Sequence, residues 1–236
     1  MGIVGPAGYA AWRATVLGSI TEAIEQRLIL ELAGDVRGQR ALDAGCGDGA
    51  LALLIAQRGA EVVAVDIDPA MLAVARMRAA EAALDVTFVE GRLEGLPFAD
   101  ETFDLVGAVT VLCFPRDAGS AVRELARVLK PGGRLVIGEL GRWSSWAALR
   151  GVRGWFGSKT WAAAHFRAPG DLKALVEQGG LSVRAVRGAV YYPPVGALAR
   201  ILAPADPWLG RRTTFGAAFL VSAAVKQAGN LETESG

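Results

Sequence analysis

The sequence has few of the residues that build disulfide frameworks or metal sites. Cys46 and Cys113 are the only cysteines among 236 residues, and they lie far apart in the chain. Two distant thiols are typical of a reduced protein rather than of a disulfide scaffold. His165 is the single histidine, so the sequence indicates no metal site of the usual histidine and cysteine kind. We therefore expect a reduced, cytoplasmic protein without a metal site.

A charge imbalance and a long hydrophobic run are also missing. The 25 basic and 24 acidic side chains give a formal net charge of +1, so no overall field attracts nucleic acid or an anionic membrane. The longest apolar run, Phe215 to Val225, is too short to cross a bilayer and is predicted to be a buried strand. The N-terminus has no basic stretch, and Arg13 interrupts the apolar residues that follow it, which argues against a secretory signal.

The chain is long and apolar enough to bury one large core. Hydrophobic residues make up 52% of the sequence, and a length of 236 residues suits one large domain. We predict a single domain over 1–228, which begins with helices in 9–33. The polar segment 229–236 is predicted to be a flexible tail.

Three glycines at alternate positions, Gly45, Gly47 and Gly49, directly follow a short apolar run. Glycine permits positive φ and close approach of a ligand to the backbone, and the helix-forming residues 50–56 come next. A strand, a glycine turn and a helix N-terminus make a cradle of nucleotide size. The same letters also spell G-x-G-x-x-A, the dinucleotide-binding fingerprint, so the motif alone leaves two cofactor classes open.

Strands alternate with helices through most of the chain. After the strand that ends at the glycine turn, further strands are predicted at 61–66, 85–90, 103–109, 134–139, 181–190 and 213–225. Helices are predicted after the glycine turn and at about 68–83, 117–129 and 171–178. This alternation implies a mostly parallel sheet with right-handed crossovers. The last two strands have no clear crossover helix between them, which suggests an antiparallel end.

Five motifs in order then resemble the class I S-adenosylmethionine-dependent methyltransferases, in the small-molecule branch that includes ubiquinone and biotin-pathway enzymes. They are residues 42–49, 65–72, 96–98, 103–106 and 127–135, and the resemblance covers about 36–140. It implies an α/β, Rossmann-like fold with a seven-stranded, mostly parallel sheet in the order 3-2-1-4-5-7-6. Strand 7 is expected to be antiparallel, and helices should cover both faces.

The resemblance implies S-adenosylmethionine as the cofactor. The glycine turn would carry its methionyl part with Asp43 near the amino group, and Asp66 would accept hydrogen bonds from the ribose hydroxyls beside Ile67, an adenine wall. The cofactor residues so predicted are Asp43, Gly45, Cys46, Gly47, Gly49, Asp66, Ile67, Met71, Arg92, Leu93 and Val109. Arg92 stands where many relatives carry an aspartate for the adenine amino group, and it either stacks on the adenine or faces solvent.

Methyl transfer from a sulfonium is an in-line displacement, so a general base is needed only if the acceptor loses a proton. Residues 111–114 replace the histidine pair that relatives often show after the fourth strand. Glu139, His165 and either Tyr191 or Tyr192 are the candidates for a base.

The segment 141–170 carries four of the six tryptophans, five basic residues and no acid. It is predicted to be a substrate lid, with Trp143, Trp146, Arg150 and Arg153 facing the acceptor, or to make transient contact with a membrane surface. The alternative is a helix that packs its aromatic side chains on the sheet and leaves its arginines solvated.

These patterns predict transfer of a methyl group to a small, apolar, lipid-like or anionic acceptor. Two rivals stay open at this point: a nicotinamide-dependent oxidoreductase, because Asp66 lies at the spacing of its ribose acid, and a non-catalytic relative that keeps the fold as a binding subunit. A base-specific nucleic-acid methyltransferase is disfavoured by the near-neutral charge. The sequence does not indicate an oligomeric state.

Overall fold

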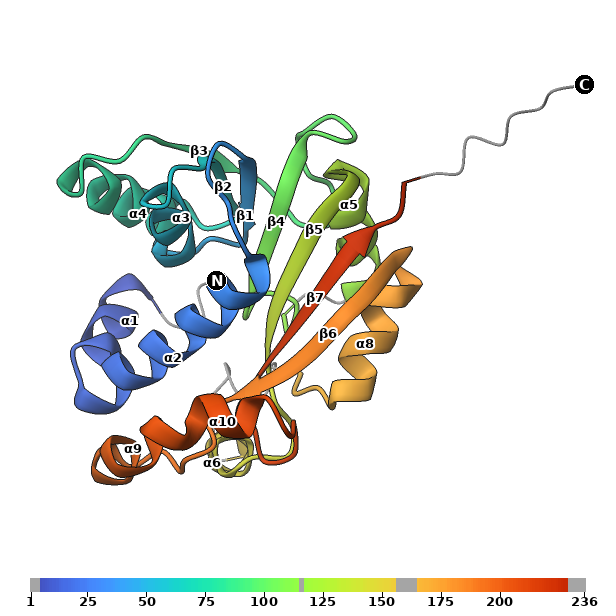
Figure 1. The fold of residues 1–236 in the computed structure, drawn as a ribbon. Helices are drawn as coiled ribbons and strands as arrows, with labels where there is room; N and C mark the ends of the chain where they lie inside the picture. Colours follow the sequence, from blue (N-terminus) through green and yellow to red (C-terminus); the bar gives the residue numbers. More distant parts are fainter. Residues whose placement is uncertain (1–4, 115–116, 156–164, 229–236) are drawn as a thin grey trace, which may run out of the picture.

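The computed structural model describes residues 5–114, 117–155 and 165–228 of the chain, and a seven-stranded sheet runs through its centre (Figure 1). The strands are β1 (Arg40–Ala44), β2 (Glu61–Asp66), β3 (Val86–Glu90), β4 (Phe103–Val109), β5 (Leu129–Leu140), β6 (Leu181–Ala189) and β7 (Phe219–Lys226). The helices are α1 (Pro6–Arg13), α2 (Val16–Ala33), α3 (Ala50–Ala56), α4 (Pro69–Glu81), α5 (Ala118–Val128), α6 (Ser145–Trp155), α8 (Pro169–Gln178), α9 (Gly196–Leu202), η1 (Ala203–Ala205) and α10 (Asp206–Gly210). None of the helices in the described ranges combines the length and apolar character that crossing a bilayer requires.

The sheet has the strand order β3-β2-β1-β4-β5-β7-β6, as predicted. The first five strands in that order pair in parallel, whereas β7 is antiparallel to both β5 and β6. The carboxyl ends of the parallel strands therefore meet at one edge, which is where ligands bind in open sheets of this kind.

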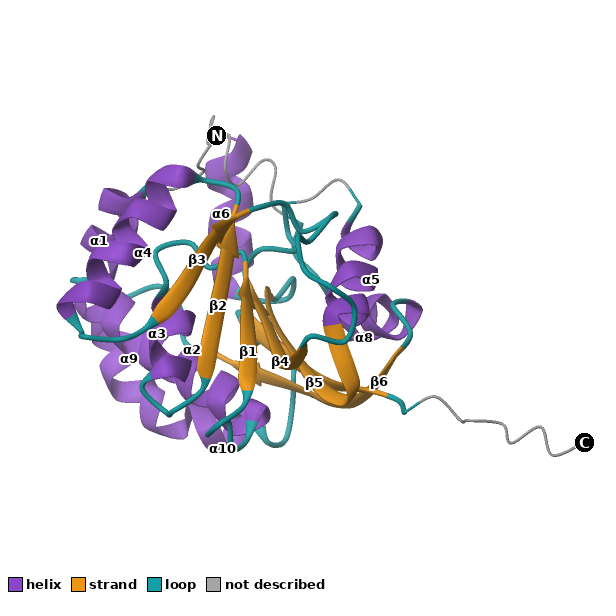
Figure 2. Ribbon diagram, turned by 90° about the horizontal axis from the view of Figure 1, so that it is seen from above, coloured by secondary structure: helices purple, strands orange, loops and turns teal. Residues whose placement is uncertain are grey.

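Helices cover both faces of the sheet (Figure 2). Neighbouring residues of a strand point to opposite faces, so Ala41 belongs to the core under α2 and α3, and Leu42 to the core under α5 and α8. The central strands are buried on both sides, which explains their continuous apolar runs.

Several helix boundaries follow local signals in the sequence. Asp68 caps α4 by accepting from the Ala70 amide at 2.9 Å, and Gly34 ends α2 with a φ of +71°. The cap of α2 is Thr15, whose hydroxyl accepts from the Gly18 amide at 3.0 Å. The expected helical region 9–33 is thus two helices, α1 and α2.

The connection between β6 and β7 differs most from the prediction. The expected strand from Thr213 is wrong for 213–218: Phe215 is 73% exposed and Gly216 turns the chain with a φ of +84°, so pairing begins only at Phe219. Residues 196–210 form the helices α9, η1 and α10, although the sequence indicates no clear helix between the last two strands. Figure 1 shows α6, α9 and α10 gathered at one end of the molecule.

Candidate functional site

The glycine turn, residues 45–49, leads from β1 into α3 at the carboxyl edge of the sheet. Gly45, Gly47 and Gly49 have φ values of +76°, +53° and +81°, which side chains rarely tolerate. The first two amides of the turn donate to the Val65 carbonyl at 2.7 and 2.9 Å and so fasten it to β2. A Cβ placed on Gly47 would meet no atom within 4 Å. The backbone is therefore open to a ligand at this position.

Asp66 ends β2 beside the glycine turn and is half-buried. Its Oδ2 accepts from the Gly47 amide at 2.7 Å, and its Oδ1 accepts from the Asp68 amide at 2.9 Å. A carboxylate oxygen can accept more than one hydrogen bond. Asp66 thus supports the turn and keeps acceptor capacity for ligand hydroxyls.

These groups fit the predicted donor, a nucleoside that carries an amino-acid tail. The open backbone at Gly47 allows close approach, Asp66 offers an anionic acceptor for ribose hydroxyls, and Ile67 beside it is 54% exposed and offers an apolar surface for a ring. Which atom of the donor each residue contacts stays a prediction.

The other predicted cofactor residues surround this edge. Met71 lies in the first turn of α4, Val109 ends β4, and Leu93 follows β3; all three are half-buried. Arg92 is exposed, and its Nε lies 3.9 Å from Glu94 Oε2. This geometry is consistent with a guanidinium that faces solvent, the second of the two predicted alternatives.

Asp43 and Cys46 are buried on either side of the start of the turn. Asp43 Oδ2 accepts from the Ala52 amide of α3 at 2.9 Å. Burial raises the pKa of Asp43 to about 7; that hydrogen bond opposes the rise and the charge of Asp66 adds to it. Burial likewise raises the pKa of the Cys46 thiol, which stays neutral.

Asp48 ties two helices to the glycine turn, a role that the sequence analysis missed. Its buried Oδ2 pairs with Arg13 of α1 and, at 2.8 Å, with Arg78 of α4. The Arg78 guanidinium also donates to the Asp48 carbonyl at 2.9 Å, and Arg13 Nε lies 3.6 Å from Glu22. The sequence did offer one signal for this role: Asp48 lies between two glycines, and a glycine turn does not itself require an acid at that position.

Glu139 lies at the end of β5, fully buried, and braces the loop 110–114 that follows β4. Its Oε1 accepts from the Leu112 amide at 3.0 Å, and Arg167 donates to the Leu112 carbonyl at 3.0 Å. Glu139 Oε2 has no hydrogen-bond partner among the described residues; the Arg167 Nε atom is 3.9 Å away. Burial raises the pKa of Glu139 to about 8, although Arg167 opposes the rise.

The other candidate bases lie in different surroundings. His165 is exposed, and its amide donates to the Cys113 carbonyl at 3.2 Å, so it borders the loop that Glu139 braces. Tyr191 follows the end of β6 and is hydrogen-bonded there: its hydroxyl donates to the Thr213 carbonyl, and its amide donates to Asp206. The structure therefore brings Glu139 and His165 to one loop.

The predicted lid connects to α2 through Trp146. This side chain is buried, and its Nε1 donates to the Tyr192 carbonyl at 2.8 Å. The Tyr192 hydroxyl lies 3.0 Å from Thr21 Oγ1 on α2, and the Arg150 guanidinium lies 5.1 Å from the centre of the Trp146 ring. Trp146 thus packs as the alternative to a lid expects, while Trp143 is 55% exposed.

The arginines of the segment 141–170 are not all available to an anionic acceptor. Arg142 pairs with Asp171 at 3.3 Å, and Arg167 faces Glu139. Arg150 lies near Glu25 of α2, whose pKa burial raises to about 8 against the attraction of Arg150. The side chain of Arg153 lies outside the described residues, as do residues 156–164 and the predicted tail 229–236.

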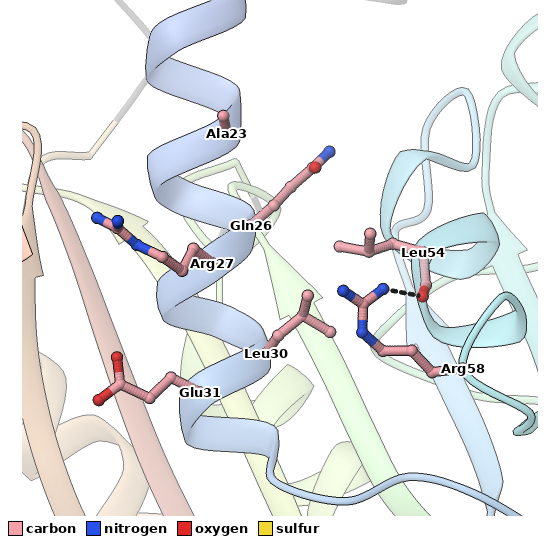
Figure 3. Close-up of a pocket in the computed structure, with 7 residues that line it drawn as sticks. All are labelled: Ala23, Gln26, Arg27, Leu30, Glu31, Leu54 and Arg58. Carbon is pink, nitrogen blue, oxygen red and sulfur yellow. Dashed lines mark hydrogen bonds between the residues drawn. The ribbon is translucent and has the colours of Figure 1, made fainter.

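A surface hollow of about 530 Å³ lies between α2 and α3 (Figure 3). It is lined by Ala23, Gln26, Arg27, Leu30, Glu31, Leu54 and Arg58. None of the predicted cofactor residues belongs to this lining, so the hollow is not the candidate site. No cluster of three metal-ligating side chains occurs in the described part of the chain.

Comparison with known proteins decides between the cofactor classes. Residues 42–137 match the family described as "Methyltransferase domain". The ubiquinone biosynthesis O-methyltransferase of Alkalilimnicola ehrlichii is 34% identical over 173 residues, which cover 70% of this chain and 69% of that protein. The chain belongs to the S-adenosylmethionine-dependent methyltransferases. It is therefore an enzyme of that cofactor class, and the oxidoreductase and non-catalytic alternatives are set aside.

Other methyltransferases resemble this chain over different lengths. The demethylmenaquinone methyltransferase of Thermus thermophilus is 43% identical over 114 residues, 48% of this chain and 52% of that protein. A methyltransferase structure from Thermotoga maritima, described as a possible histamine N-methyltransferase, superposes with a TM-score of 0.72 and 22% identity, covering 94% of this chain and 95% of that one. At 22% identity, the similarity to the Thermotoga maritima structure supports the methyltransferase fold alone.

Proposed function

We propose that this methyltransferase acts on a ring hydroxyl of an aromatic quinone precursor with an apolar tail. The observation that carries the proposal is the 34% identity to a ubiquinone biosynthesis O-methyltransferase over 70% of the chain. That span extends beyond the donor motifs at 42–137. The resemblance to that enzyme therefore covers more of the chain than the segment that carries the donor motifs.

S-adenosylmethionine supplies a methyl group bound to a positively charged sulfur. The glycine turn and Asp66 would hold this donor in a fixed orientation at the carboxyl edge, with the loop 110–114 beside it. Orientation of donor and acceptor, together with exclusion of water, is the main task of the protein in such a displacement.

We propose that Glu139 accepts the proton that the acceptor hydroxyl loses during methyl transfer. Its Oε2 is buried and has no hydrogen-bond partner in the described part of the chain. Burial raises the pKa of Glu139 to about 8, so its ionised form takes up a proton readily. Glu139→Gln keeps an oxygen for the Leu112 amide but cannot accept a proton. We expect the wild-type rate to rise with pH through about 8 and the variant to lose both that rise and roughly 10²–10⁴-fold in rate.

The pH profile separates catalysis from support of the loop. Arg167→Lys, which changes the opposite brace of the Leu112 peptide, serves as the control and should keep the rise with pH. If Glu139→Gln lowers the rate but leaves the shape of the profile unchanged, Glu139 only positions the loop.

The acceptor would lie between the sheet edge, α6 and the N-terminal helices. Of the residues that the sequence predicts, we propose Trp143, Arg150 and Arg153 as its contacts. Trp146, which is buried and donates to the Tyr192 carbonyl, would support Arg150 from behind. The Arg150 guanidinium lies over the Trp146 ring, and Glu25 of α2 lies near Arg150. We also propose that the enzyme is one domain over 1–228 and works in the cytoplasm on a small molecule.

Methylation of ring carbon is the second candidate. It is favoured by the 43% identity to a demethylmenaquinone methyltransferase, although that match spans 114 residues. The two candidates differ in the bond that forms: an aryl ether in the first, an aryl carbon–carbon bond in the second.

The test is transfer of isotopically labelled methyl from S-adenosylmethionine to two acceptors, a prenylated catechol and a prenylated naphthoquinol. We expect the catechol to gain a methyl ether, identified by NMR of the product. Label on a ring carbon of the naphthoquinol would select the second candidate. Transfer to neither, by enzyme that binds S-adenosylhomocysteine in a titration, would contradict both.

A further inference from the structure

The connection between β6 and β7 exposes large apolar side chains along one continuous segment. We call this the 198–215 surface; its exposed members are Leu198, Ile201, Leu202, Trp208 and Phe215, with fractional exposures of 40%, 72%, 43%, 55% and 73%. Single exposed apolar residues are common, but a group of this size within one short stretch marks an interaction surface.

The helical part of this surface has a buried side and an outward side. Ala199 is fully buried, in the same core as α2. Leu198, Ile201 and Leu202 are spaced i, i+3 and i+4, so they share one face of α9 that the core does not cover. Packing on the sheet therefore does not explain why these three residues are apolar.

Aromatic side chains extend the surface towards α6. The ring of Trp143 lies 6.3 Å from that of Phe215, and both are more than half exposed. The Arg212 guanidinium stacks over Trp208 at 4.2 Å from the ring centre. Tryptophan and arginine with apolar stems are the side chains that place a helix in the interfacial region of a bilayer.

The charge of the surface has one sign. Between Val195 and Gly216 the basic residues Arg200, Arg211 and Arg212 are exposed. The only acid there, Asp206, is buried and accepts from the amides of Val190 and Tyr191. An anionic lipid surface complements this arrangement, whereas a two-fold contact between copies would bring like charges together.

We propose that the 198–215 surface docks the enzyme on the surface of an anionic lipid bilayer, with its apolar side chains inserted and its arginines at the headgroups. No spanning segment is involved, in keeping with the lack of a membrane-crossing helix among the described residues. Its helices α9 and α10 lie at the same end of the molecule as α6 (Figure 1). It is a separate segment from 141–170, and the proposal does not depend on the identity of the acceptor.

Sedimentation with lipid vesicles tests the proposal. We expect the full chain to bind vesicles of phosphatidylglycerol and phosphatidylcholine, to bind pure phosphatidylcholine at least tenfold less, and to be released by salt. Ile201→Ser with Phe215→Ser, and separately Arg211→Gln with Arg212→Gln, should each lower binding at least tenfold. Titration with S-adenosylhomocysteine should give wild-type affinity for every variant, which shows that each one is folded.

Matched changes elsewhere serve as controls. Met77→Ser removes an apolar side chain of α4 that is 54% exposed. Arg37→Gln with Arg58→Gln removes two exposed charges at the opposite edge of the sheet. Both control variants should bind anionic vesicles like wild type. Failure to bind anionic vesicles, equal binding to both vesicle types, or unchanged binding by the two surface variants would overturn the proposal. A dimer in light scattering that Ile201→Ser with Phe215→Ser abolishes would also overturn it, because a second copy would then cover the surface.

Discussion

At the scale of single residues, the acids around the glycine turn have different surroundings. Asp66 is half-buried and receives two amides, Asp43 is buried and receives one, and Asp48 is buried between two arginines. Asp66 therefore combines ordered geometry with access to a ligand, whereas Asp48 ties α1 and α4 to the glycine turn.

Replacement of Asp66 tests this difference. Asp66→Ala should weaken binding of S-adenosylhomocysteine by roughly 1.5–3 kcal/mol, the scale for losing hydrogen bonds to a charged group, as measured by isothermal titration. Asp68→Ala is the control: it removes the cap of α4 and should lower stability by about 1 kcal/mol without a similar loss of affinity. Unchanged affinity of Asp66→Ala would remove Asp66 from the site.

At the scale of elements, an ionic contact ties the end of α1 to the glycine turn. No residue of α1 is fully buried, but Arg13 at its end pairs with Asp48 and approaches Glu22. The Arg13 side chain is only 13% exposed, so the pair is shielded from solvent. The pair of Arg13 with Asp48 therefore fixes the end of α1 beside the glycine turn.

Loss of that contact should release α1. We expect Arg13→Ala to speed cleavage by chymotrypsin after Tyr9 or Trp12, measured by mass spectrometry, while cleavage elsewhere stays slow. Arg27→Ala, an exposed arginine on α2, should behave like wild type. Equal cleavage of α1 in both variants would show that other contacts hold it.

The elements also show how far the sequence predicts the structure. The strand order and the antiparallel β7 are confirmed, because motifs and β-branched runs specify the central strands directly. The helices at 196–210 were missed, since Pro193, Pro194, Pro204 and Pro207 indicate a connection. The helices at 196–210 are short and depend on tertiary contacts, such as the packing of Ala199 in the same core as α2. Such contacts cannot be read from the local sequence.

The candidate site was also predictable only in part. The glycine turn and Asp66 follow from motifs and lie together as expected. The pairs of Asp48 with Arg13 and of Glu139 with Arg167 join residues far apart in sequence, and an arginine-rich composition hides such partners. Only the fold selects them.

At the scale of the whole molecule, buried carboxyl groups make stability depend on pH. Asp43 and Glu139 are 2% and 0% exposed, and burial raises their pKa values to about 7 and about 8. Between the unfolded-state values near 4 and these folded-state values, the folded protein binds more protons than the unfolded chain. The free energy of unfolding therefore falls as pH rises through this range.

We expect the melting temperature of the ligand-free enzyme to fall from about pH 5 to about pH 8, measured by differential scanning calorimetry. Glu139→Gln removes one ionising group, so its melting temperature should fall less over the same range. A melting temperature that rises towards about pH 8, or equal slopes for the two proteins, would contradict the effect of burial on Glu139.

The most direct test of the central claim is a crystal structure with S-adenosylhomocysteine bound. We predict its ribose hydroxyls within hydrogen-bond distance of Asp66, its amino-acid part against Gly45 and Gly47, and its sulfur facing the loop that Glu139 braces. A ligand bound in the hollow between α2 and α3, or with its ribose away from Asp66, would contradict the claim.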